Sequence, residues 1–99
     1  MILSSNISDN RALVTISGEI DTLDAESLIS ELESLPEEAR FIDFDLENAS
    51  YISSSGLRAL LKAMKMSEKR GGAMSIVKSG EFVREILSVV GFDKLFKVL

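Results

Sequence analysis

The spacing of apolar residues switches repeatedly along this 99-residue chain between the period of a strand and the period of a helix. Residues 12–20, ALVTISGEI, alternate, so that Val14, Ile16, Gly18 and Ile20 would face one side. The next apolar residues recur at i, i+3, i+4 and i+7, which is typical of one helix face: Ala25, Leu28, Ile29, Leu32 and Leu35. Alternating strands and helices favour a mainly parallel sheet, because each helix carries the chain back across it.

The rest of the chain continues this order. Residues 3–7 predict a strand that pairs with the next one as an antiparallel hairpin, and residues 41–46 and 73–77 predict two further strands. A second helix carries Leu57, Leu60, Leu61 and Met64, and Gly71 would end it in a left-handed conformation. A third helix, which Ser79 can cap, would carry Phe82, Val83, Ile86, Leu87 and Val90, and residues 95–99 would add an edge strand.

These segments predict one α/β domain over residues 1–99. It should have three helices and a mostly parallel sheet of about four to five strands with one antiparallel edge.

Composition narrows the possible chemistry. The chain has no cysteine and no histidine, so it lacks thiolate metal ligands and the commonest general base. Its net charge of −5 argues against nucleic acid or an anionic membrane as the main partner. We expect no secretory leader, because residues 1–10 have no basic segment ahead of an apolar stretch, and the sequence contains no apolar run of about 18 residues. We therefore expect a cytoplasmic protein with no cofactor, no metal, no nucleic-acid partner and no membrane insertion.

Candidate catalytic groups are few. Asp43, Asp45 and Glu47 would share one face of a strand, where carboxylates can serve acid–base or magnesium chemistry. The same spacing is typical of the solvent side of an edge or half-exposed strand, which we favour. The glycines form neither a phosphate-binding loop nor a dinucleotide fingerprint, and no histidine could activate a serine. We expect that the protein is not an enzyme.

Three consecutive serines, Ser53 to Ser55, stand directly before Gly56 and the second predicted helix. A serine here can cap the helix by accepting a backbone hydrogen bond. It can also be phosphorylated, which adds about two negative charges at a helix N-terminus that tolerates them.

The second predicted helix also carries a basic stripe, formed by Arg58, Lys62, Lys65 and Lys69. Such a stripe can be a solvated helix face, or it can be a docking face for an acidic partner.

Three segments resemble the STAS family, and the bacterial anti-sigma factor antagonists in particular. They are GEID (residues 18–21), DLENASYISSSGLRALL (residues 45–61) and the closing Gly91, Phe92 and LFKVL. The resemblance covers essentially the whole chain and implies partner switching. Such an antagonist binds an anti-sigma factor that is also a serine kinase of the histidine-kinase-like ATPase fold. Phosphorylation by that kinase ends binding, and a serine phosphatase restores it.

The phosphorylated serine of the family corresponds in position to Ser54. The resemblance therefore implies that Ser54 is phosphorylated, with Ser53 and Ser55 as alternatives. The partner-binding residues it implies are Asp21, Ser53, Ser55, Gly56, Arg58 and Lys62. One position departs from the pattern, because well-known members have aspartate where this chain has Ser53. The alternative is a constitutive STAS accessory subunit or scaffold, for example of a lipid-transport ATP-binding cassette complex, with the serines as caps.

Overall fold

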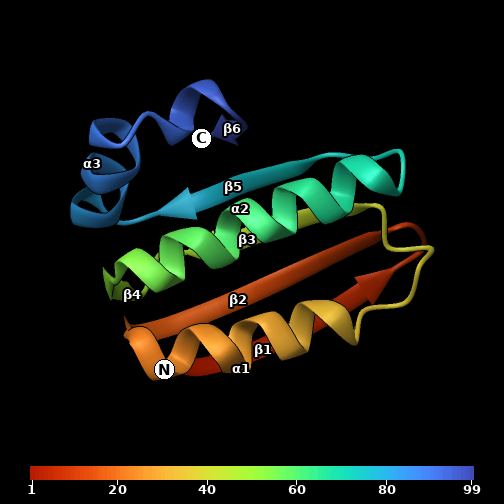
Figure 1. Ribbon diagram of the computed structural model, residues 1–99, viewed down its shortest axis with the longest axis horizontal. Helices are drawn as coiled ribbons and strands as arrows, with labels where there is room; N and C mark the ends of the chain where they lie inside the picture. Colours follow the sequence, from red (N-terminus) through yellow and green to blue (C-terminus); the bar gives the residue numbers. More distant parts are fainter.

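The computed structural model describes residues 1–99 as a six-stranded sheet with three α-helices and one short 3-10 helix (Figure 1). The elements, in chain order, are β1 (Ile2–Ser8), β2 (Arg11–Ile20), α1 (Thr22–Glu33), β3 (Phe41–Leu46), β4 (Ala49–Ile52), α2 (Ser54–Lys69), β5 (Met74–Ser79), α3 (Glu81–Val89), η1 (Phe92–Lys94) and β6 (Lys97–Val98).

The sheet has the strand order β1-β2-β3-β5-β6, and β4 pairs with β2 beside this path. β1 and β2 form the antiparallel hairpin, closed by a turn in which Asp9 has a φ of 55°. Every other pairing is parallel. The predicted fold class, a small α/β domain with a mostly parallel sheet and one antiparallel edge, is confirmed. The four-residue strand β4 was not predicted, because it is too short to show a period.

The core lies between the sheet and helices α1 and α2, which cross the same face of the sheet (Figure 1). β2 and β3 direct Ile16, Ile20 and Phe44 into it, and α1 and α2 contribute Leu28 and Leu60.

The helix face predicted for α1 is the face that it buries, except that Ile29 is only partly covered. In α2, only Leu60 of the predicted apolar residues is buried, while Leu57, Leu61 and Met64 are partly covered. The face that α2 buries otherwise consists of small residues: Gly56, Ala59, Ala63 and Ser67. Gly71 has a φ of 81° just after α2, as the C-terminal signal predicted.

The predicted features of the third helix are partly wrong. Its N-cap is Gly80, and Ser79 ends β5, where its hydroxyl accepts a hydrogen bond from Arg84 Nε at 3.4 Å. Of the five apolar residues that this segment carries, Val83 and Leu87 are buried. Few residues of this helix are buried because α3 is short and packs against β4 at one end of the sheet, rather than across its face (Figure 1).

The predicted environment of the carboxylates on β3 also needs correction. β3 lies in the middle of the sheet, not at an edge, and Asp43 is only 8% exposed. Arg11 covers it, donating a 2.7 Å hydrogen bond from Nη1 to Asp43 Oδ2. Asp45 accepts a hydrogen bond from the backbone N–H of Glu47, so both of these β3 carboxylates have structural partners.

Candidate functional site

A bulge in β2 brings two distant parts of the chain together. The first half of β2 pairs with β3, and its last residues pair with β4, with a register shift between Gly18 and Glu19. Gly18 has a φ of 84°, a conformation that glycine adopts without steric cost, and its N–H donates to the carbonyl of Asn48. β2 can therefore change partners because glycine occupies this position.

The pairing of β2 with β4 places Asp21 beside the serine junction. Ile20 lies opposite Ile52, and the backbone N–H of Ser53 donates to the carbonyl of Ile20 at 2.8 Å. Asp21 and Ser53 follow these two residues directly, so they lie side by side at the end of the sheet where α1 and α2 begin (Figure 1). The structure thus joins GEID and the serine junction in one site.

The hydroxyls of two of the three serines have partners within the chain. Ser53 is the N-cap of α2; its Oγ accepts the backbone N–H of Gly56 at 3.1 Å, and the residue is 7% exposed. Ser55 is half-buried and accepts a hydrogen bond from Arg58 Nη2 at 3.4 Å. The capping function that the sequence left open among the serines therefore belongs to Ser53.

Ser54 differs from both neighbours. It is the first residue of α2, its side chain is exposed, and its hydroxyl makes no hydrogen bond within the chain. The first backbone N–H groups of a helix have no intrahelical acceptor, and the helix dipole adds positive potential there. An added phosphate on Ser54 would therefore lie where the local backbone accepts negative charge.

Gly56 allows α2 to begin close to the ends of β2 and β4. A Cβ on this residue would lie 2.7 Å from Cγ1 of Ile52 and 3.0 Å from Cγ2 of Ile20. Both isoleucines are buried, so neither can move away freely. Among the predicted partner-binding residues, Gly56 and Ser53 thus lie beneath the surface, whereas Asp21, Arg58 and Lys62 are exposed.

We expect Gly56→Ala to shift the start of α2 and to destabilise the fold by about 1–3 kcal/mol, the usual cost of overpacking a core. Thermal denaturation measures the loss, and the amide resonance of Ser54 reports the shift. Gly80→Ala is the matched control, because a Cβ there meets only the Glu47 carbonyl oxygen at an ordinary 3.4 Å. Equal stability of the two variants would contradict the packing argument.

Asp21 caps α1 through a reciprocal pair of hydrogen bonds. The backbone N–H of Asp24 donates to Asp21 Oδ1 at 2.9 Å, and the backbone N–H of Asp21 donates to Asp24 Oδ2 at 3.0 Å. The hydrogen bond from the Asp24 backbone lowers the pKa of Asp21 below its ordinary value of 3.8, because it favours the charged carboxylate. A fixed negative charge therefore lies beside the serine junction.

The depressed pKa of Asp21 predicts a pH dependence of stability. A carboxyl group with a lower pKa in the folded state stabilises the fold above its unfolded pKa, and this contribution is lost as pH falls through the folded pKa. Asp21→Asn keeps a capping oxygen but does not titrate. We expect wild type to melt at a higher temperature than Asp21→Asn at neutral pH, and the difference to shrink below the ordinary value of 3.8. A difference that is constant with pH would contradict a charge effect.

The basic stripe of α2 is exposed and forms no ion pair. Arg58, Lys62, Lys65 and Lys69 are all exposed, and the one ion pair in the structure joins Arg11 to Asp43 elsewhere. α2 carries four basic residues and one acidic residue in a chain of net charge −5, so the rest of the chain has a net charge of −8. The surface of α2 is therefore the main positive region of an acidic protein.

No group of three or more potential metal-ligating side chains comes together. None of the helices is long and apolar enough to cross a membrane.

Fold and site together define a small α/β domain with an exposed serine, Ser54, at a helix N-terminus, beside the ionised Asp21. Residues 3–99 match the STAS domain family. The chain therefore belongs to the STAS domain family.

Known proteins similar to this chain include the anti-sigma-B factor antagonist of Bacillus subtilis, which is 28% identical over 90 residues, covering 91% of this chain and 83% of that protein. The crystal structure of an anti-sigma factor antagonist from Mycobacterium paratuberculosis superposes with a TM-score of 0.84 at 24% identity, covering 98% of this chain and 83% of the other. The Bacillus cell fate determinant SpoIIAA in its phosphorylated form superposes with a TM-score of 0.78 at 16% identity, covering 99% and 91%. These two structural likenesses show the fold.

Proposed function

We propose that this protein is an anti-sigma factor antagonist that acts by partner switching controlled at Ser54. In the unphosphorylated form it binds an anti-sigma factor serine kinase of the histidine-kinase-like ATPase fold in the cytoplasm, and the sigma factor is released. Phosphorylation of Ser54 ends binding, and a serine phosphatase restores it. The protein itself catalyses nothing. The observation that carries the proposal is that Ser54 alone among the three serines is exposed and free of hydrogen bonds.

The physical basis of the switch is local electrostatics. A phosphate on Ser54 adds about two negative charges next to the ionised Asp21. The helix N-terminus tolerates this charge, so the fold persists. A partner surface that matches the neutral serine would instead face buried, unpaired charge on binding. The same modification is therefore compatible with the fold and incompatible with the complex.

The departure at Ser53 fits this proposal. Aspartate and serine are both preferred N-caps, so exchanging one for the other keeps the hydrogen bond to the N–H of Gly56 and the start of α2. What changes is the charge beside Ser54. We propose that Ser53 preserves the geometry of the site while the cognate kinase recognises a less acidic surface.

Phosphopeptide mapping of the protein from its native cells, in growth and under stress, tests the proposal. Phosphate on Ser54 with an occupancy that changes with condition is the expected result. Phosphate found only on Ser55 would identify Ser55, and not Ser54, as the regulatory serine. Phosphate on no serine, including after co-expression with a candidate kinase, would overturn the proposal in favour of a constitutive accessory subunit or scaffold.

The exposed start of the basic stripe supplies a further prediction. Arg58→Glu with Lys62→Glu should weaken association with the kinase, mostly through a slower association rate, and the effect should decrease as salt is added. Surface plasmon resonance at two ionic strengths measures both. Lys94→Glu with Lys97→Glu makes the same change in net charge on the exposed C-terminal residues and is the matched control. Equal rates for the two double variants would show that Arg58 and Lys62 are merely solvated.

A further inference from the structure

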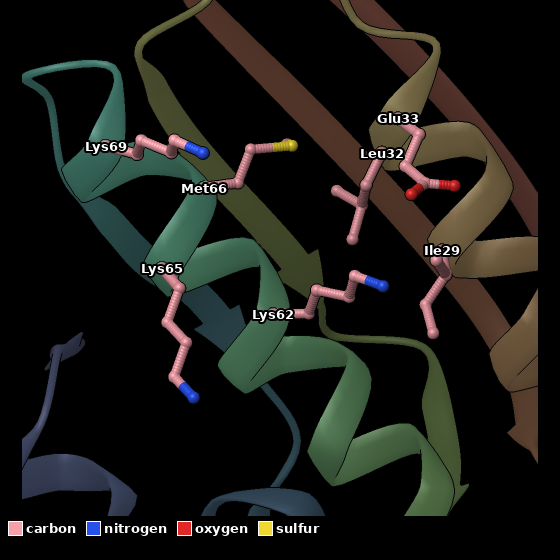
Figure 2. A pocket seen from close by; sticks show the side chains of 7 residues that line it. All are labelled: Ile29, Leu32, Glu33, Lys62, Lys65, Met66 and Lys69. Carbon is pink, nitrogen blue, oxygen red and sulfur yellow. The ribbon is translucent and has the colours of Figure 1, made fainter.

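The groove between α1 and α2 is a separate feature of this surface. Its volume is about 350 Å³, and its floor consists of the apolar side chains of Ile29, Leu32 and Met66. Leu32 is buried in the core, whereas Ile29 and Met66 are only partly covered and extend the core to the surface. Figure 2 shows these three side chains between the two helices. An apolar strip of this kind is suited to contact with another apolar surface.

The two edges of the groove carry opposite charges. On the α2 edge, Lys62 and Lys69 extend toward the groove, while Lys65 points away from α1 (Figure 2). On the α1 edge, Glu33 also lines the groove, and its carboxylate lies over α1 beside Leu32 (Figure 2). α1 contains four acidic residues and no basic one. No ion pair within 4.0 Å joins Glu33 to a lysine, so the charges on both edges are available to a partner.

We propose that this groove is a docking site for an amphipathic helix of a partner protein, with acidic residues along the edge that faces α2. A third helix suits the space between two packed helices, and helix-in-groove binding requires an apolar stripe with polar edges. The unpaired lysines attract acidic residues on one edge, and Glu33 disfavours them on the other. Charge thus fixes the orientation of the bound helix.

The groove is only weakly coupled to Ser54. Lys69 lies fifteen residues after Ser54 on α2, which is about 22 Å along the helix axis. The Debye length at physiological ionic strength is about 8 Å, so a phosphate on Ser54 would be screened at this distance. Lys62, the groove lysine nearest to Ser54, is eight residues or about 12 Å away, which also exceeds one Debye length, so docking in the groove depends only weakly on phosphorylation. Lys62 also belongs to the stripe that we propose contacts the kinase, so the two binding surfaces share this residue.

The experiment uses a designed 18-residue helical peptide with leucines on one face and glutamates along one edge, titrated into the full-length protein. Methyl resonances of Ile29, Leu32 and Met66 report binding. Saturable shifts of these methyls are expected, with affinity about tenfold lower for Lys62→Glu with Lys69→Glu and unchanged for Lys97→Glu. Ser54→Asp should bind the peptide as wild type does. A peptide with lysine in place of each glutamate should bind at least about tenfold more weakly.

Several results would overturn the proposal. Equal affinity for the glutamate and lysine peptides would contradict the role proposed for the groove lysines. Chemical-shift changes centred on α3 would show that the peptide binds there and not in the groove. Shifts produced by laurate and not by the peptide would assign the groove to an anionic amphiphile. Because the peptide assay requires no kinase and no phosphate, its failure would leave the proposed switch at Ser54 untouched.

Discussion

Replacing Ser54 with aspartate should leave the fold intact and weaken binding of the proposed partner kinase by about 100-fold. Aspartate in the first turn of a helix interacts favourably with the helix dipole, so the melting temperature should stay equal to that of wild type or rise slightly. The carboxylate would nevertheless lie beside Asp21 and would be buried unpaired in the complex, which typically costs about 2–5 kcal/mol. Isothermal titration calorimetry with the purified kinase measures the loss.

Two further substitutions at Ser54 separate charge from shape. Ser54→Asn has the size of aspartate without the charge, and should bind much more tightly than Ser54→Asp. Ser54→Ala should bind like wild type and should accept no phosphate, so the complex would persist in the presence of ATP. Tight binding by Ser54→Asp, or equally weak binding by Ser54→Asn, would contradict an electrostatic switch.

The largest effect on stability should come from Gly72→Ala. A Cβ at this position would overlap the backbone carbonyl of Arg40, which precedes β3 and cannot rotate away as a side chain could. Either the end of α2 or the start of β3 must then move, and we expect a loss of about 3 kcal/mol or more. Since domains of this size are stable by only about 5–15 kcal/mol, urea denaturation should show a large decrease in midpoint.

Gly71→Ala is the matched comparison, because the neighbouring glycine is required for a different reason. Gly71 has a φ of 81°, and a Cβ added to it would meet no atom within 4 Å, so only the left-handed conformation resists substitution. That strain costs about 1–2 kcal/mol. The prediction is wrong if Gly72→Ala is no more destabilised than Gly71→Ala.

Much of the fold could be predicted, because most elements carry a periodic apolar pattern. α1 buries residues that recur every three or four positions, and β2 buries Val14, Ile16 and Ile20 of its alternating residues. In α2, by contrast, only Leu60 of the predicted apolar residues is buried. Local capping chemistry also predicted that Gly71 ends α2. These features depend on contacts between residues close in sequence, so they can be predicted from the sequence alone.

The features that escaped prediction depend on contacts between distant segments. β4 has four residues and forms a strand only because the bulge at Gly18 turns β2 toward it. The apolar residues Phe82 and Val90 follow a helical period, yet they are 55% and 46% exposed because of where α3 packs. The groove beside α2 exists only because α1 lies next to it.

For the candidate site, the sequence alone determined that three serines precede a helix that carries a basic stripe, and the resemblance singled out Ser54. Only the tertiary structure decided how the three hydroxyls differ: Ser53 caps the helix, Ser55 contacts Arg58, and Ser54 is left exposed. It also decided that Asp21 lies beside them, thirty-two residues away from Ser53 in the chain. The physical reason is that accessibility and proximity are set by the parallel pairing of β2 with β4, a contact that no local pattern encodes.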